Sequence, residues 1–125
     1  MQVPESLRYA TSHEWVSVTD GIATIGVTDH AQAELTDVVY LELPTPGKQV
    51  KAGDAVAVIE SVKAANDIYT PVSGEVVEFN PNLETDPSAV NHAPYTDGWM
   101  FRIRLSDPGE IEKLLTPAEY RSQIS

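Results

Sequence analysis

The stretch Val56-Ala57-Val58-Ile59-Glu60-Ser61-Val62-Lys63-Ala64-Ala65-Asn66-Asp67-Ile68-Tyr69-Thr70 decides the predicted fold, because one lysine lies between two mostly apolar arms. Both arms contain β-branched residues, which favour strand on each side of Lys63. A reversal centred on the lysine would make the following pairs: Val62 with Ala64, Ile59 with Asp67 and Val58 with Ile68. The pattern therefore predicts a β-hairpin with Lys63 alone at its tip, where it would serve as a chemical handle.

A weak internal repeat flanks this hairpin. Val50-Lys51-Ala52-Gly53-Asp54-Ala55-Val56 precedes it, and Pro71-Val72-Ser73-Gly74-Glu75-Val76-Val77 follows it. Both copies run in the order small residue, glycine, acid and apolar strand. Two related half-units joined by a hairpin predict a flattened β barrel or sandwich with pseudo-two-fold symmetry, from one end of which Lys63 would project.

The remaining segments indicate a mainly β architecture with short helices. Alternating or β-branched patterns predict strands over residues 12–18, 22–27, 38–43 and 99–105. In the last of these, Trp99 and Phe101 are expected to share one face with Ile103 and Leu105.

Helices are predicted at two places. Thr28 or Asp29 is expected to cap a short helix that runs to Leu35. The segment from Pro108 to Ile124 predicts one or two helices, with Thr116-Pro117 as a cap and first position. Residues 80–94 are predicted to form a polar loop, because prolines interrupt them.

Length and composition favour a single domain over residues 1–125, since a chain with 42% hydrophobic residues buries one core and leaves little for a second. The first residues lack the basic and apolar regions of a secretory signal. No apolar run approaches the roughly 18 residues that span a membrane. The absence of cysteine excludes disulfides, thiolate metal sites and a cysteine nucleophile.

The formal net charge of −11 at pH 7 bears on the choice of partners. Nucleic acids and anionic membranes are not expected to bind, because both require a positive protein surface. An acidic chain of this kind is either simply well solvated or is steered toward basic patches on partner proteins.

Few residues fit a catalytic or metal-binding pattern. His13, His30 and His92 are the only histidines and lie in separate segments, so their spacing predicts no metal site. The serines lack a nucleophile-elbow sequence, and no phosphate-binding glycine loop is present. We therefore expect no catalytic residue.

A Schiff-base lysine is the strongest enzymatic alternative for Lys63. Such a lysine needs a depressed pKa, from burial or from a neighbouring cation. A solvated lysine near Glu60 and Asp67 has the opposite surroundings, because acids favour its protonated form. Lys63 is better suited to being acylated by another enzyme, and the simplest alternative is a plain surface lysine.

Several sequence blocks extend beyond the hairpin, and their order is informative. They are Tyr9, Ser12-His13-Glu14-Trp15, Ala23-Thr24-Ile25-Gly26, Thr28-Asp29-His30-Ala31-Gln32, Leu41-Glu42-Leu43-Pro44, Glu60-Ser61-Val62-Lys63-Ala64-Ala65-Asn66-Asp67, Pro71-Val72-Ser73-Gly74-Glu75-Val76, Pro94-Tyr95 and Gly98-Trp99. Together they resemble the glycine cleavage system H protein family, in the family's order, from about Leu7 to the C-terminal helix.

The resemblance implies a fold, a cofactor and a role. The fold would be the flattened β barrel-sandwich hybrid of lipoyl and biotinyl domains, with short helices and a C-terminal helix. Lys63 would carry lipoic acid in amide linkage, and the protein would be a non-catalytic shuttle of the aminomethyl group of glycine. Its expected partners are glycine decarboxylase (P-protein), aminomethyltransferase (T-protein), dihydrolipoamide dehydrogenase (L-protein) and a lipoate-attaching enzyme.

The resemblance also implies roles for other residues. A labile cargo with a protonated amine calls for a sheltered groove with an acidic partner, for which Glu14, Asp67 and Ser12 are the candidates. Glu60 and Gly74 are expected to govern recognition by the lipoate-attaching enzyme. We expect a monomer in the cytoplasm, with a processed mitochondrial form as the alternative.

Two other classes of protein remain open. Another swinging-arm carrier is one, either a lipoyl domain of an oxo-acid dehydrogenase or a biotinyl domain. Biotinyl domains usually have methionine beside their lysine, whereas Lys63 has Val62 and Ala64, and no linker to a catalytic domain is evident. A member of the family that donates or binds lipoyl groups without being modified is the other class.

Overall fold

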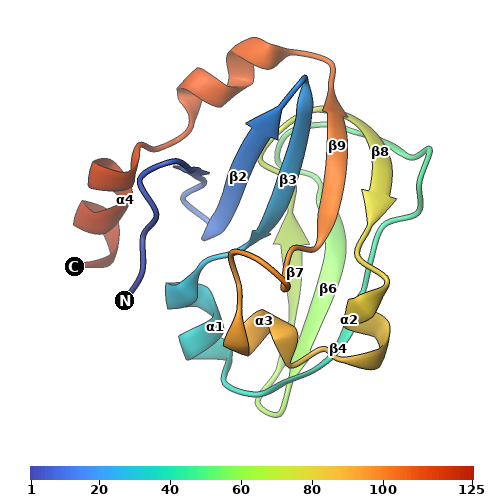
Figure 1. Ribbon diagram of the computed structural model, residues 1–125, viewed down its shortest axis with the longest axis vertical. Helices are drawn as coiled ribbons and strands as arrows, with labels where there is room; N and C mark the ends of the chain where they lie inside the picture. The colour runs from blue at the N-terminus through green and yellow to red at the C-terminus, as the bar shows by residue number, and fades with distance from the viewer.

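The computed structural model describes residues 1–125 and consists of two antiparallel β sheets with short helices around them (Figure 1). The six-stranded sheet has the order β1 (Arg8–Tyr9), β2 (Glu14–Thr19), β3 (Ile22–Val27), β9 (Phe101–Leu105), β8 (Gly74–Phe79) and β5 (Gln49–Val50). The three-stranded sheet has the order β4 (Val38–Glu42), β6 (Ala55–Ser61) and β7 (Ala65–Tyr69). The smaller sheet lies behind the larger one in Figure 1, which confirms the predicted mainly β, two-layered class.

The repeat that flanks the hairpin contributes to both sheets. Its first copy leads into β6 of the small sheet, and its second copy leads into β8 of the large sheet. The two sheets differ in strand number, so the halves of the molecule are unequal. Gly53 has a φ of 94° in a turn, whereas Gly74 is the first residue of a paired strand. The two glycines therefore have different structural roles.

The main core fills the space between the sheets. Ile25, Phe101 and Ile103 of the large sheet are fully buried, and so is Ile59 of the small sheet. These residues belong to a single cluster of 18 buried side chains. Burial of this apolar surface on the facing sides of two sheets is the main force that holds the layers together.

A second cluster covers the outer side of the large sheet at β2. It consists of four buried residues: Leu7, Tyr9, Trp15 and Tyr120. The rings of Tyr9 and Tyr120 stack with their centroids 4.7 Å apart. Gly26 pairs with Trp15, and a Cβ atom at Gly26 would lie only 2.7 Å from the indole nitrogen. Strand β2 is therefore buried on both faces near its start.

The two predicted helix starts are confirmed. Helix α1 (Asp29–Leu35) has Thr28 as its N-cap, and the Thr28 hydroxyl accepts a hydrogen bond from the Ala31 amide. Helix α4 (Pro117–Ile124) has Thr116 as its cap, with a reciprocal capping box to Glu119. A 3₁₀ helix, η1 (Pro108–Lys113), precedes it.

Two sequence expectations about the region before β9 are wrong. Residues 80–94 are not a plain loop, because α2 (Asn82–Thr85) and α3 (Ala89–His92) each form one turn and bury Leu83 and Val90. Helices this short show no periodicity in the sequence. Trp99 does not share the Phe101 face; it precedes the strand, and its ring lies 3.9 Å from the Arg102 guanidinium carbon.

Candidate functional site

The hairpin around Lys63 forms, with a register one residue away from the predicted one. The observed pairs are Glu60 with Ala65, Ile59 with Asn66, Val58 with Asp67 and Ala57 with Ile68. This register places buried Ala57, Ile59 and Ile68 on the same face of the small sheet. A slip by one residue would move side chains between faces, so burial of the core selects the register.

The turn itself consists of Ser61, Val62, Lys63 and Ala64. Lys63 therefore shares the tip with Val62 and is not alone there. The Ser61 hydroxyl accepts hydrogen bonds from the amides of Lys63 at 3.2 Å and Ala64 at 3.3 Å, while the Ser61 amide donates to the Ala64 carbonyl at 2.9 Å. One serine thus fixes the backbone that presents the exposed lysine.

The tip of the hairpin contacts the end of α1 and the segment that follows it. The Lys63 amine donates to the carbonyl of Glu34 at 3.3 Å, near the C-terminal end of α1. The Val62 amide donates to the carbonyl of Asp37 at 3.0 Å. The Lys63 side chain is therefore exposed to solvent, and its amine lies against the end of α1.

A cavity of about 260 Å³ lies beside this contact. Its apolar lining comes from both sheets and α1: Val27, Ala31, Leu35, Ile59 and Ile68. Its polar lining comes from the segment before β2, from α1 and from β7: Ser12, His13, Glu34, Asn66 and Asp67. Larger hollows exist on the molecule, but this one includes Glu34, whose carbonyl accepts from Lys63.

Two of the three predicted groove residues, Ser12 and Asp67, line this cavity, and both are exposed. The third, Glu14, is not part of the lining and is only 1% exposed. The Ser12 hydroxyl donates a hydrogen bond to Glu14 Oε1, and the Tyr69 amide donates to Oε2 at 3.3 Å. Glu14 therefore lies behind the cavity wall and reaches it through Ser12.

Burial gives Glu14 unusual acid–base behaviour. Removal from water raises the pKa of its carboxyl to about 7, although the hydrogen bonds from Ser12 and Tyr69 act in the opposite direction. A carboxyl with such a pKa holds either a proton or a charge near neutral pH. By contrast, hydrogen bonds from backbone amides lower the pKa values of the Asp29 and Glu119 carboxyls.

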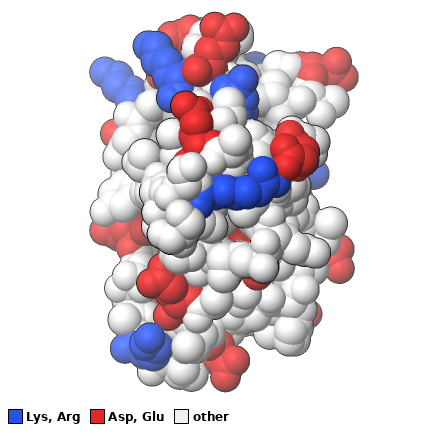
Figure 2. Space-filling view, turned by 90° about the vertical axis from the view of Figure 1, so that its left-hand side faces the viewer, with Lys and Arg blue, Asp and Glu red and all other residues white.

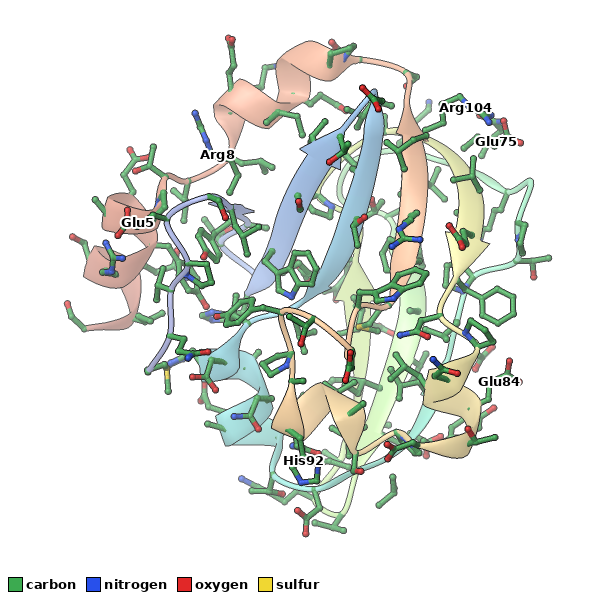
Figure 3. The ribbon with its side chains drawn as sticks, viewed as in Figure 1. Glu5, Arg8, Glu75, Glu84, His92 and Arg104 are labelled. Carbon is green, nitrogen blue, oxygen red and sulfur yellow. The ribbon has the colours of Figure 1, made fainter.

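Glu60 and Gly74 occupy different parts of the molecule. Glu60 lies in β6 next to the turn and pairs with Ala65 and Tyr40. Gly74 begins β8 beside Glu75, which Figure 3 shows at the end of the molecule opposite the hairpin tip. A Cβ atom at Gly74 would approach the Arg104 carbonyl oxygen to 2.0 Å, so the close packing of β8 against β9 requires glycine there.

His13 and Glu34 line the cavity although sequence analysis did not select them. His13 precedes β2, whereas Glu34 lies near the end of α1, so only the fold brings them together. One local signal was available for Glu34, which lies one helical turn after His30 and accepts from it at 2.7 Å.

On the side of the molecule shown in Figure 2, basic and acidic side chains are interspersed. None of the helices is long and apolar enough to cross a membrane.

Comparisons with known proteins give a consistent result over the whole chain. Residues 7–125 match the sequence model of a family described as Glycine cleavage H-protein. The glycine cleavage system H protein of Alcanivorax borkumensis is 55% identical, over 98% of this chain and 96% of that protein. The probable glycine cleavage system H protein of Aeropyrum pernix is 53% identical, over 96% of this chain and 84% of that protein.

A solved structure supports the fold. The crystal structure of a glycine cleavage system H protein from Mycobacterium marinum superposes with a TM-score of 0.90 at 32% sequence identity. The match covers 97% of this chain and 98% of that chain.

Proposed function

Because this chain belongs to the Glycine cleavage H-protein family, we propose that it carries the aminomethyl group of glycine on a lipoyl group attached to Lys63. One observation supports this assignment above the others. Lys63 is exposed at a tight, hydrogen-bonded turn, and its amine contacts the Glu34 carbonyl beside the cavity. An attaching enzyme can reach such a lysine, and a group bound to it starts next to a partly apolar recess.

The residues present fit an amide-linked lipoyl group. The turn leaves the Lys63 amine free for acylation, and the apolar lining of the cavity suits the hydrocarbon chain of lipoic acid. When bound, lipoic acid supplies a disulfide that takes up the aminomethyl group and is left as a dithiol after the group is passed on. The protein contributes position and shelter, and it performs no turnover of its own.

Three enzymes and an attaching enzyme would be the partners. Glycine decarboxylase (P-protein) would load the aminomethyl group, aminomethyltransferase (T-protein) would remove it, and dihydrolipoamide dehydrogenase (L-protein) would restore the disulfide. Glu60, beside the turn, is well placed for recognition by the lipoate-attaching enzyme. Gly74 would influence that recognition only through the shape of the fold, because it lies far from the tip.

Ser12, Asp67 and Glu14 would shelter the cargo. Its protonated amine would be held by the exposed carboxylate of Asp67 and by the Ser12 hydroxyl, with Glu14 behind that hydroxyl. The apolar lining would limit access of water to the labile group. The carrier would act as a monomeric single domain in the cytoplasm, and its bacterial and archaeal relatives support that location.

The decisive experiment is intact-mass measurement after incubation with a lipoate-attaching enzyme. We expect one lipoyl increment in the wild type and none in Lys63→Arg, because arginine keeps the charge but cannot form the amide. Lys51→Arg is the matched control, since Lys51 is also exposed in a turn and should leave the increment unchanged.

The modified protein should then support glycine–bicarbonate exchange with purified P-protein. A biotinyl increment in place of lipoyl, or a lipoyl increment that persists in Lys63→Arg, would contradict the assignment. Lipoylation of Lys63 without glycine–bicarbonate exchange would indicate a lipoyl carrier of another enzyme system.

A further inference from the structure

The side chains of His13, His30 and Glu34 form a cluster. The proposed carrier function assigns no role to these three side chains. His30 and Glu34 lie one turn apart on α1, with Nε2 and Oε1 separated by 2.7 Å. The His13 ring lies 4.8 Å from the His30 ring, measured between centroids. One donor atom from each of His13, His30 and Glu34 falls within 4.8 Å of the other two.

The fold fixes the orientation of His13. Its Nδ1 lies 2.8 Å from the Tyr120 hydroxyl, which in turn lies 2.7 Å from the Thr28 hydroxyl. Thr28 also accepts the capping bond from the Ala31 amide. If Tyr120 donates to Thr28, it accepts the Nδ1 proton of His13, and Nε2 of His13 keeps its lone pair.

A histidine held in this way by a second group resembles a preorganised metal ligand. Metal-bound histidines usually donate their other ring nitrogen to an oxygen acceptor, which sets the tautomer. Burial and the neighbouring His30 lower the pKa of His13, so the neutral ring that a metal requires is favoured. His13 has a φ of 75°, in the left-handed region that asparagine, aspartate and histidine enter more often than other residues apart from glycine.

We propose that His13, His30 and Glu34 bind one divalent transition-metal cation, with Zn²⁺ as the best match. Two imidazoles and one carboxylate are a common three-ligand set for Zn²⁺, which leaves a fourth position for water or another ligand. Zinc ligands lie about 2.0–2.2 Å from the metal, so their donor atoms must come within roughly 3.5 Å of one another. The exposed Glu34 side chain and half-buried His30 are free to make that adjustment.

The cation would form part of the cavity wall. His13 and Glu34 line the same cavity as Ser12 and Asp67, so the open position would face the recess or the solvent at its edge. The site uses only side chains of this chain and does not depend on modification of Lys63. Its failure would therefore leave the proposed carrier function untouched.

The test is calorimetric titration of the full-length protein, with Lys63 unmodified, against Zn²⁺. Binding at a single site is expected, and His13→Asn or His30→Gln should weaken it by about 100-fold, since each removes a ligand. Asparagine at position 13 tolerates the positive φ. Tyr120→Phe removes only the hydroxyl that orients His13 and should weaken binding by about tenfold.

His92→Gln is the matched control. His92 is exposed at the end of α3 and does not belong to the cluster (Figure 3). Zn²⁺ should shift the imidazole nuclear magnetic resonance signals of His13 and His30 and leave those of His92 in place. Equal weakening by His92→Gln, unchanged signals of His13 and His30, or no measurable binding would overturn the site and indicate an adventitious ion only.

Discussion

At the scale of single residues, Glu14 shows most clearly how burial changes the acid–base behaviour of a side chain. Its position in the sequence suggested an acid at the edge of a groove, but the fold buries it beneath Ser12 with two hydrogen bonds. Burial stabilises the neutral form of the carboxyl, and the hydrogen bonds only partly offset this effect. Asp67 remains exposed to water, so of the two carboxyls only Glu14 is desolvated by the fold.

The raised pKa of Glu14 predicts a pH-dependent cost in folding stability. The pKa rises from 4.5 in the unfolded chain to about 7 in the folded protein, so the folded state binds the proton more tightly between these values. Stability should therefore fall as pH rises through this window, by about 3 kcal/mol in total. Denaturant unfolding of the wild type and Glu14→Gln, in buffer with a metal chelator, would measure the difference.

Glutamine is a suitable reference because it has nearly the same shape and still pairs with Ser12 and the Tyr69 amide. The difference between the two stability curves isolates the contribution of Glu14, because the two proteins differ only at that position. A difference that stays constant from pH 4 to pH 8 would show that Glu14 has an ordinary pKa in the folded state.

At the scale of elements, the β6–β7 hairpin is a rigid support for Lys63. Strand β6 lies between β4 and β7, so its backbone is paired on both sides up to the turn. The Ser61 hydroxyl then takes the place of a backbone acceptor for the amides of Lys63 and Ala64. The tip is also held by the contact of Lys63 with the Glu34 carbonyl in α1 and by the contact of Val62 with the Asp37 carbonyl just after that helix.

Removal of the Ser61 hydroxyl should loosen the tip without unfolding the protein. Ser61→Ala leaves the Lys63 and Ala64 amides without their side-chain acceptor, at a cost of about 1 kcal/mol. Hydrogen exchange at these two amides should then accelerate by about fivefold, while core amides such as that of Ile103 stay protected. Ser17→Ala is the control, because the Ser17 hydroxyl has no partner near the turn. Unchanged exchange at the tip would exclude Ser61 as its support.

At the scale of the whole molecule, the two sheets place the site where distant segments meet. The cavity combines the segment before β2, helix α1 and both strands of the hairpin. The net charge of −11 acts over the entire surface and favours encounters with basic partners. Arg104 and Glu75 pair across β9 and β8 at the opposite end from the hairpin tip (Figure 3).

The net charge predicts that association with the proposed partner, P-protein, depends on ionic strength. Electrostatic steering weakens as salt screens the charges, so the association rate constant should fall by about tenfold between low and high salt. The dissociation rate constant should change much less, because it depends on short-range contacts. Stopped-flow measurement over a salt series would show this, and an association rate that is insensitive to salt would refute steering by the acidic surface.

The sequence by itself determined the features that rest on neighbours along the chain. Alternating and β-branched patterns located strands β2 and β3, Thr28 and Thr116 identified the helix starts, and the two apolar arms located the turn at Lys63. Each of these depends on hydrogen bonds and side-chain patterns within a few residues. The same local blocks carried the resemblance to the family.

Only the tertiary structure decided the features that depend on packing between distant segments. Burial of Ala57, Ile59 and Ile68 against the large sheet shifted the hairpin register by one residue. The fold also buried Glu14 and brought His13 to His30 and Glu34. The physical reason is that local patterns fix which face of an element is apolar, whereas desolvation and contacts between elements depend on which faces finally meet.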